Sequence, residues 1–352
     1  NSLQLGTAAN FTMAGGTVEF NGDSGEIFQS ITFDSGILQN SANAAEFTLS
    51  QGISLVGTNC DFNVTNDASL EVDAVITNTG SLYETGNGIL TLTNNNAYTG
   101  STIIEGGTLA LAGSISNSAL ISVHSGATLN VTGRGDQTLT LNAGQTLTGK
   151  GSLNGILVAS PGSIVAPGGT LTAGTFTVAN NASLNGTLLI NLNNTNTPNS
   201  SQIVSTSGTI TYAGTLSVTN TGPALQAGQT FQLFPSAVST FANINLPTTD
   251  ASGNTYTWND QITVNGSITV ATVTPTGTIN PNPGKIQFSI SGSTLSLAWP
   301  TNSGWLLQTQ TNSLAVGISN NWVTIPGSAA ITSTNITINP GIGSVFYRMV
   351  HP

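Results

Sequence analysis

Charged side chains are scarce in this sequence, and basic ones are the scarcest. Only 5% of the 352 residues are charged, whereas an ordinary soluble domain carries about 25%. Four lysines and arginines stand against 14 aspartates and glutamates, which gives a formal net charge of −10. Binding to nucleic acid requires a basic stripe that neutralises phosphates, and docking on anionic lipid requires a similar basic cluster. The few cations are spread along the chain and make neither, so we expect no nucleic-acid partner.

Cysteine, helix-forming residues and long hydrophobic runs are also lacking. Cys60 is the only cysteine, which excludes an internal disulfide framework and a multi-cysteine metal site. No stretch reaches the roughly 18 apolar residues that a membrane helix needs, so we expect no membrane insertion. The best helical candidate is the short segment 42–47. Low charge with abundant serine, threonine and asparagine favours an exported protein.

The residues that fill the chain instead are those of strands and tight turns. Threonine, valine and isoleucine prefer strands, while glycine and asparagine prefer turns. A glycine followed by small polar residues and a leucine recurs, with its leucine at positions 109, 129, 147, 171 and 188. Each repeat alternates apolar with polar residues, which places one set of side chains inside a coil and the other outside. The pattern predicts an all-β chain built on a β-solenoid.

The character of the sequence changes three times along the chain. We expect a β-solenoid over residues 1–194 and a terminal β section, capping or extending the solenoid, over residues 195–271. Residues 272–284 are rich in proline and threonine and indicate a semi-rigid linker. Short strand candidates separated by turn residues then predict a small β-sandwich over residues 285–352.

One stretch of the solenoid carries a more specific pattern. Between Gly86 and Gly113 a Leu-x-Leu run is followed by Asn-x-Tyr-x-Gly-x-Thr and then by Gly-x-Leu. The residues that make up this pattern are Leu90, Leu92, Asn96, Tyr98, Gly100, Thr102, Gly107 and Leu109. The stretch strongly resembles the autotransporter-associated β-strand repeat. That resemblance implies a right-handed parallel β-helix, export by a bacterium, and an extracellular or cell-surface role, and it implies no reaction. The segment from Gly304 to Arg348 resembles a sandwich module found behind such repeats in exported bacterial proteins.

Residue types that support catalysis are few. Arg134 is the only cation with an acid near it in sequence, Asp136, and a polar turn with a local ion pair explains both. His124 is expected on the outside of its strand, and no Gly-x-Ser-x-Gly elbow or phosphate loop occurs. We therefore expect no enzyme, no catalytic residue and no cofactor. A polysaccharide-active β-helix enzyme is the least favoured alternative.

Two further groups of residues allow either a binding role or a structural one. The turn Asn21–Glu26 offers oxygen ligands of the kind that Ca²⁺ prefers, but its spacing is no EF-hand, and we expect no metal site. Trp299, Trp305 and Trp322 fall within the expected sandwich. Tryptophan in a small sandwich is more often core than a platform for sugars.

Covalent glycans are a hypothesis for how a chain with so little charge stays soluble. The Asn-x-Ser/Thr pattern that accepts N-linked sugar is frequent here. The candidate residues are Asn10, Asn63, Asn130, Asn181, Asn185, Asn193, Asn199, Asn265 and Asn335, with Thr274 and Thr276 beside prolines as candidates for O-linked sugar.

The open ends of a solenoid connect the expected fold with a function. Each end presents unpaired backbone groups, which are either covered or used for pairing. The chain begins in strand-like sequence, so the candidate self-assembly strand comprises Ser2, Leu3, Gln4, Leu5 and Phe11. We expect a non-enzymatic structural subunit of an extracellular fibre whose partners are copies of itself, joined head to tail by strand pairing or end stacking. The alternative is a monomeric cell-surface adhesin with a β-helix stalk.

Overall fold

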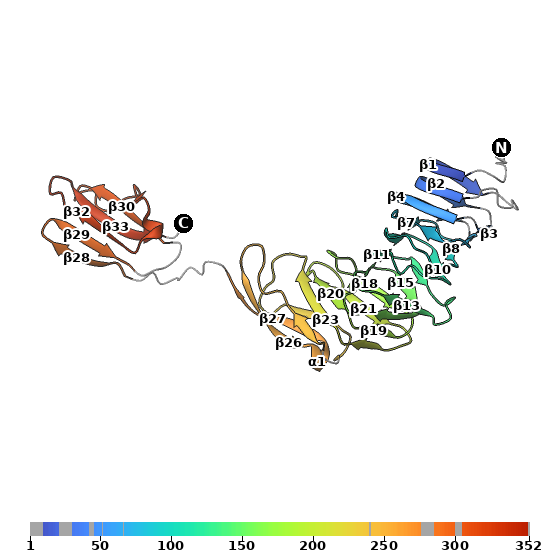
Figure 1. The fold of residues 1–352 in the computed structure, drawn as a ribbon. Coiled ribbons are helices and arrows are strands. Elements are labelled where there is room, and N and C mark those ends of the chain that lie inside the picture. Colours follow the sequence, from blue (N-terminus) through green and yellow to red (C-terminus); the bar gives the residue numbers. More distant parts are fainter. Residues whose placement is uncertain are drawn as a thin grey trace. The chain divides into compact units, whose positions relative to one another are not determined.

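The computed structural model describes residues 10–20, 30–41, 46–50, 52–65, 67–238, 241–275, 285–299 and 305–350. Nearly all of its regular structure is strand, as Figure 1 shows, and the helical exceptions are α1 (Ile262–Asn265) and a 3₁₀ turn (Ser328–Ala330). The chain divides into two compact units, one of residues 1–250 with 256–273 and one of residues 251–255 with 274–352. The all-β class expected from composition is confirmed.

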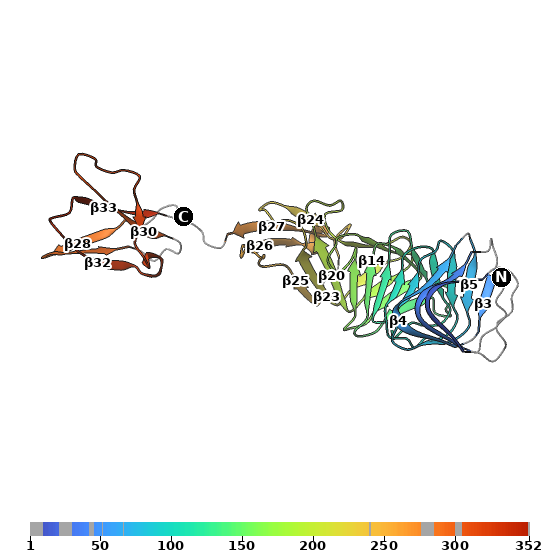
Figure 2. The same ribbon diagram turned by 90° about the horizontal axis from the view of Figure 1, so that it is seen from above.

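The first unit is a parallel β-solenoid whose largest wall is a 12-stranded sheet. Each strand pairs in parallel with the strand one turn further along the chain, and Figure 2 shows this stacking from above. In order along the sheet, these strands are β1 (Asn10–Phe20), β2 (Ser30–Asn40), β4 (Gly52–Val64), β7 (Leu82–Glu84), β9 (Thr102–Ile104), β11 (Leu120–Val123), β14 (Thr146–Gly149), β17 (Ile164–Pro167), β20 (Thr187–Leu192), β23 (Thr215–Asn220) and β25 (Asn243–Asn245), with β6 (Ile76–Thr77) paired to β4.

Two further parallel sheets form the other sides of the solenoid. The 8-stranded sheet contains β3 (Glu46–Leu49), β5 (Ser69–Val72), β8 (Ile89–Leu92), β10 (Thr108–Leu111), β12 (Thr128–Asn130), β15 (Ser152–Asn154), β18 (Thr175–Val178) and β21 (Gln202–Ser205). The 4-stranded sheet contains β13 (Thr138–Leu141), β16 (Ile156–Ala159), β19 (Ala182–Leu184) and β22 (Ile210–Tyr212). The predicted parallel solenoid is therefore confirmed.

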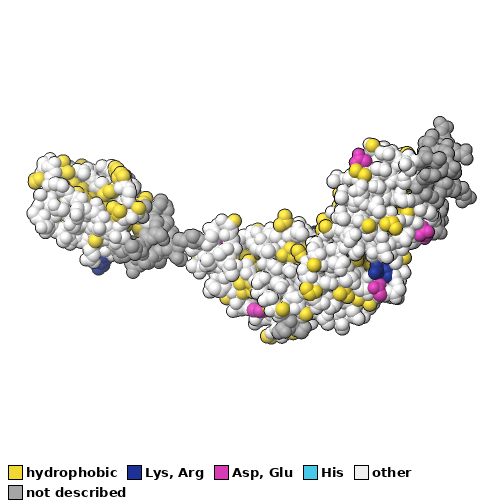
Figure 3. Space-filling model, in the orientation of Figure 1, with side chains coloured by type: hydrophobic (Ala, Val, Ile, Leu, Met, Phe, Trp, Pro, Cys, Tyr) yellow, Lys and Arg dark blue, Asp and Glu magenta, His cyan; other side chains and the backbone are white. Residues whose placement is uncertain are grey.

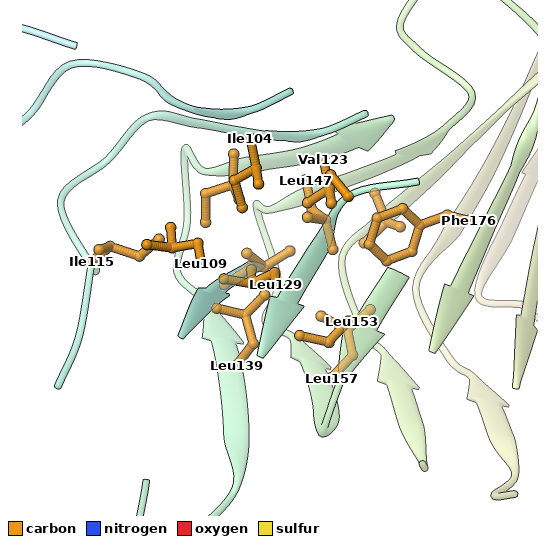
Figure 4. Packing of buried hydrophobic residues seen from close by; sticks show 14 of the residues in the cluster. Ile104, Leu109, Ile115, Val123, Leu129, Leu139, Leu147, Leu153, Leu157 and Phe176 are labelled. Carbon is orange, nitrogen blue, oxygen red and sulfur yellow. The ribbon is translucent and has the colours of Figure 1, made fainter. Parts of the chain in front are cut away.

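Columns of identical or similar side chains form the core. Leu70, Leu90, Leu109, Leu129 and Leu153 stand in register on five successive strands of the 8-stranded sheet, and all are fully buried. Figure 4 shows how such residues from different sheets meet in the interior. Alternation along each strand selects which residues point inward, and the parallel register stacks them turn upon turn.

Two local expectations differ from the structure. The Gly-Thr-Leu triplet at 169–171 is no strand, because it lies in the loop between β17 and β18, where the Leu171 side chain is 76% exposed. The helical candidate 42–47 is also wrong for residues 46 and 47, since Glu46 and Phe47 begin β3; residues 42–45 lie outside the described part. In both cases the positions of the turns in the solenoid determine the local structure, and the local residue pattern does not.

Antiparallel strands follow the last parallel ones. Strands β24 (Thr230–Gln232), β27 (Ser267–Thr274) and β26 (Thr255–Gln261) form a three-stranded sheet whose buried residues belong to the same hydrophobic core as the solenoid. The ring of Tyr212 on β22 meets Phe234 edge to face, with centroids 4.9 Å apart, and meets Phe241 in a tilted contact, with centroids 5.1 Å apart. The core therefore continues from the solenoid into this sheet.

The second unit contains a small two-sheet module. Strands β28 (Gln287–Ser291), β29 (Thr294–Ala298) and β32 (Ser333–Thr337) form one antiparallel sheet, and β31 (Val323–Thr324), β30 (Leu306–Asn312) and β33 (Ser344–Val350) form the other. Leu297 on β29 and Trp299, which follows that strand, meet Leu307 on β30 in a shared core. The expected small sandwich is present, and Trp299 is indeed a core residue. Residues 276–284 of the expected linker lie outside the described part, and the domain boundaries stay a prediction.

Candidate functional site

The repeat recognised in the sequence, residues 86–113, forms one turn of the solenoid. Its polar residues Asn96, Tyr98 and Thr102 are buried there. The Asn96 side chain is 3% exposed and lies inside a corner. Its Oδ1 accepts a hydrogen bond from the Ile76 amide at 2.9 Å, and its Nδ2 donates to the Asn94 carbonyl at 2.9 Å. The Asn96 amide donates to the Ser114 carbonyl at 2.8 Å. This one asparagine therefore connects three successive turns.

A buried hydroxyl network follows at the next corner. The Tyr98 hydroxyl lies 2.6 Å from Thr102 Oγ1, which lies 2.9 Å from Ser118 Oγ. Ser118 Oγ donates to the Gly100 carbonyl at 2.8 Å. Burial raises the pKa of the Tyr98 phenol well above its usual range, so it stays protonated. The network satisfies polar groups inside the wall, which is a structural role.

Glycine at position 100 is required by the closeness of the turns. A Cβ placed there would lie 2.1 Å from the Gly80 carbonyl oxygen, which stands one turn earlier. At Gly107 the backbone has a φ of +52°, and a Cβ would lie 2.5 Å from the Gly88 oxygen. The repeat pattern thus encodes how tightly the chain turns and stacks.

A buried carboxyl group stands inside the solenoid just before these residues. Glu84 pairs in register with Phe62 on one side and Ile104 on the other, and its side chain is fully buried. Neither carboxylate oxygen has a hydrogen-bond partner among the described residues. Burial, and to a lesser degree the charge of Asp61, raises the pKa of Glu84 to about 9. The Gly86 amide opposes this pKa shift without making a hydrogen bond of normal geometry. We infer that Glu84 is a neutral acid at pH 7.

The cysteine and the cation–acid pair singled out in the sequence are structural. Cys60 is fully buried and its Sγ donates to the Phe33 carbonyl at 3.0 Å, and burial raises the pKa of the thiol to about 11. Arg134 Nε lies 3.2 Å from Asp136 Oδ1, and its Nη1 donates to the Gly113 carbonyl. The Thr138 amide donates to Asp136 Oδ1 at 3.1 Å and is the main cause that lowers the pKa of this carboxyl. The Arg134–Asp136 pair is thus built into a turn.

The candidate glycosylation residues are spread over both units. Asn10, Asn181, Asn185, Asn265, Asn335 and Thr274 are exposed, while Asn63, Asn130, Asn193 and Asn199 are half-buried. Thr276 lies outside the described residues. In three of the motifs the asparagine Oδ1 accepts hydrogen bonds from both the amide and the hydroxyl two residues on, which are the pairs Asn130–Thr132, Asn193–Thr195 and Asn265–Ser267.

The candidate self-assembly strand is only partly described. Ser2, Leu3, Gln4 and Leu5 lie outside the described residues, whereas Phe11 lies in β1 and packs against the core. Strand β1 pairs in parallel with β2, and no described strand pairs with its other edge.

The small module has an unprotected edge and an apolar surface. Strand β28 pairs only with β29 among the described strands, and all of its residues are exposed. Phe288 and Ile290 stand opposite Leu297 and Leu295, so they share the core-facing side of the sheet. They are nevertheless 72% and 61% exposed, because the second sheet does not cover them. Apolar side chains are visible over this module in Figure 3.

The candidate metal-binding turn and Trp322 are the remaining candidate sites. Among the described residues no group of three His, Cys, Asp or Glu side chains could hold a metal ion, and the candidate turn Asn21–Glu26 lies outside them. Within the same part of the chain no helix is long and apolar enough to cross a membrane. Trp322 is half-buried beneath the Arg348 guanidinium, which lies 4.3 Å from its ring centroid.

Comparison with known proteins gives one match. The family described as passenger-associated-transport-repeat matches residues 82–111, which run from β7 to the end of β10. No curated protein matches the chain. The matched repeat and the parallel solenoid around it fit an autotransporter passenger-type β-helix repeat protein, and they imply an exported, surface-associated chain.

Proposed function

We propose that this exported, passenger-type β-helix chain is a non-enzymatic structural subunit that joins copies of itself head to tail into an extracellular fibre. The joining elements are the edge of β28 in the module of one copy and the solenoid of the next. A contact between two different surfaces that does not close on itself produces a filament.

The observation that carries this proposal is the uncharged edge strand β28. Natural sheets protect an exposed edge with charged residues, proline, bulges or a covering segment. The β28 sequence Gln-Phe-Ser-Ile-Ser has neither a charge nor a proline, and its apolar side chains Phe288 and Ile290 are exposed. Such an edge is a template for pairing with a strand of another chain.

The distribution of charge favours a head-to-tail arrangement over a symmetric one. No lysine or arginine precedes Arg134, while most of the acidic residues do. Residues 285–352 contain Lys285 and Arg348 and no acidic residue. Opposite charge at the two ends of the chain attracts the module of one copy to the N-terminal part of another and disfavours pairing of like ends.

Electron microscopy of the native, secreted protein tests the proposal. We expect filaments whose axial repeat is close to one subunit. Ile290→Lys places a charge on the edge of β28 and should leave single particles, while Leu314→Lys, at a residue that is 87% exposed in a loop of the same module, should still form filaments. Deletion of residues 2–13 should also prevent assembly. Filaments in the Ile290→Lys variant would show that β28 is not the contact.

The alternative function is a monomeric surface adhesin, and the apolar surface of the module supports it. Leu314, Val316 and Ile318 on one loop are exposed in addition to Phe288 and Ile290. Exposed apolar side chains that gather on a small domain mark an interaction site. Single short rods in the native material would favour this function, and the module would then be screened against surface partners.

We also propose that glycans are attached to the exposed asparagines. Asn181, Asn185, Asn265 and Asn335 have the room that a sugar requires, because their side chains are exposed. Intact-mass spectrometry of native material should then exceed the 35.7 kDa of the bare chain. A mass equal to that of the polypeptide would rule the modification out.

A further inference from the structure

An open hollow of about 410 Å³ lies on the outer wall of the solenoid, at the corner between its two largest sheets. The ends of β11 and β14 form its floor, and the loop after β17 forms its rim. His124 and Lys150 line it together with Ser122, Ser125 and Thr170. Its volume is within the range of about 300–1,000 Å³ that is usual for ligand sites.

The hollow exists because one corner is longer than the corners stacked on it. The Lys150 amide donates to the Val123 carbonyl at 3.0 Å, and the Gly168 amide donates to the Gly149 carbonyl at 2.6 Å, so these corners belong to successive turns. Lys150 and Gly151 alone separate β14 from β15. By contrast, residues 168–174 separate β17 from β18 and overhang the shorter corners.

The overhanging loop is held in place from inside the solenoid. Asn191 is fully buried on β20, and its Nδ2 donates to the Gly169 carbonyl at 2.7 Å and to the Thr172 carbonyl at 3.3 Å. Thr172 Oγ1 donates to the Gly168 carbonyl at 2.9 Å. A buried side chain that anchors a surface loop gives the hollow a fixed rim.

The lysine at the floor of the hollow is positioned by glycine. A Cβ at Gly174 would lie 2.7 Å from Lys150 Cε and 2.9 Å from its Cγ, so the lysine stem rests directly on the Gly174 backbone. Gly149, immediately before the lysine, has a φ of +116°, and a Cβ there would lie 1.9 Å from the Val123 carbonyl oxygen. Because the lysine stem is already packed, binding a ligand restricts less of its conformational freedom.

The hollow is lined by basic side chains, although the chain as a whole is acidic. Before residue 285 the sequence contains only two residues of the lysine and arginine type, Arg134 and Lys150. Arg134 is paired with Asp136, whereas no carboxylate of the described residues lies within ion-pair distance of Lys150. His124 comes from the turn before and lines the same hollow.

We propose that this hollow binds an acidic saccharide, a sugar chain that bears carboxylate or sulfate groups. The Lys150 ammonium is the partner for the acidic group, and charge-assisted hydrogen bonds of this kind are the strong ones. The His124 ring and the hydroxyls of Ser122, Ser125 and Thr170 offer hydrogen bonds to sugar hydroxyls. Because the hollow is open to the surface, a chain can pass through it. Such binding does not require that the protein forms fibres.

Titration calorimetry of the full chain with oligogalacturonate tests the proposal, and neutral dextran serves as the comparison. Lys150→Met keeps the stem that packs on Gly174 and removes the charge. We expect it to weaken oligogalacturonate binding about tenfold, the effect of losing one charge-assisted hydrogen bond. Lys285→Met removes an equal charge from an exposed site in the second unit and should leave binding unchanged. Circular dichroism confirms that both variants are folded.

Each other outcome overturns the inference. Equal binding of dextran and oligogalacturonate would show that the acidic group is not recognised. Binding of free galacturonate or sulfate without any gain from the longer sugar would show a simple anion site. Unchanged affinity in the Lys150→Met variant would place binding elsewhere on the molecule. A loss of self-association in that variant, without saccharide binding by the wild type, would assign the hollow to contacts between copies.

Discussion

Asn96 shows how one side chain can fix the pitch of the solenoid. Its Oδ1 accepts a hydrogen bond from the Ile76 amide in the turn before, and its own amide donates to the Ser114 carbonyl in the turn after. We expect Asn96→Ala to lower the free energy of unfolding by about 2 kcal/mol, since it leaves buried backbone groups without partners. Asn95→Ala, at the exposed neighbouring position, is the matched control. Chemical denaturation measures both, and equal stabilities would contradict the assigned role.

Glu84 makes the stability of the fold depend on pH. Its pKa is raised from 4.5 to about 9 in the folded chain. Folding therefore requires a proton that the unfolded carboxyl gives up above pH 4.5, so stability is greatest below that pH and falls as the pH rises towards 9. The expected loss is roughly 3 kcal/mol at pH 7. Asp61, whose own pKa is raised mainly by burial, adds to the effect by its charge.

Glu84→Met should remove this dependence, because the methionine is apolar and its neighbours Phe62 and Ile104 are apolar. We expect the variant to gain more stability over the wild type at pH 8 than at pH 4, as measured by thermal unfolding. Asp67→Asn, at an exposed acid, should show no such difference between the two pH values. A gain that is equal at pH 4 and pH 8 would indicate better packing rather than a buried proton.

At the residue scale, the alternation of apolar and polar residues predicted which side chains are buried. It did not predict the contacts that a residue makes with neighbouring turns. Leu90, Leu92 and Leu109 were expected inside the coil, and all three are buried. The same alternation applied from Leu82 would have placed Glu84 inside as well, so a signal for the buried acid was present. By contrast, the roles of Asn96 and Gly100 depend on backbone groups one turn away, an amide for Asn96 and a carbonyl for Gly100, which no local pattern contains.

The strands owe their stability to stacking in register. Leu109 on β10 lies between Leu90 on β8 and Leu129 on β12, and removing it leaves a cavity that opens onto both. We expect Leu109→Ala to lower the free energy of unfolding by about 3 kcal/mol, which is usual for such a change in a core. Thr108→Ala, at the adjacent half-buried position, should cost less than about 1 kcal/mol. Urea denaturation distinguishes them, and similar losses would contradict the stacked arrangement.

At the element scale, the repeat identified the class of fold but not every strand. Leu109 and Leu129 belong to one column of the 8-stranded sheet, whereas Leu147 and Leu188 stand on the 12-stranded sheet. Corner length varies from turn to turn, so a constant interval between leucines cannot locate the strands. The same variation produces the loop 168–174 and brings His124 beside Lys150 in one hollow, which sequence order alone does not reveal.

The two units of the whole molecule differ greatly in the size of their cores. The buried core of the solenoid extends from Met13 to Val270, whereas that of the module consists of Leu297, Trp299 and Leu307 with partly buried neighbours. Stability rises with the buried area of a cooperative unit, so the module should unfold first on heating. Three of the four tryptophans, Trp299, Trp305 and Trp322, lie in the module.

Two probes can therefore follow the two units separately. Tryptophan fluorescence reports mainly the module, and far-ultraviolet circular dichroism reports mainly the strands of the solenoid. We expect the fluorescence midpoint to lie at least about 5 °C below that of circular dichroism, the shift that about 1 kcal/mol produces in a small domain. Trp258→Phe removes the one tryptophan of the solenoid and should leave the early transition intact. Coincident midpoints would mean that solenoid and module unfold as one cooperative unit. If the native protein forms fibres through β28, assembly should delay the fluorescence transition more than the other, because the contact lies in the module.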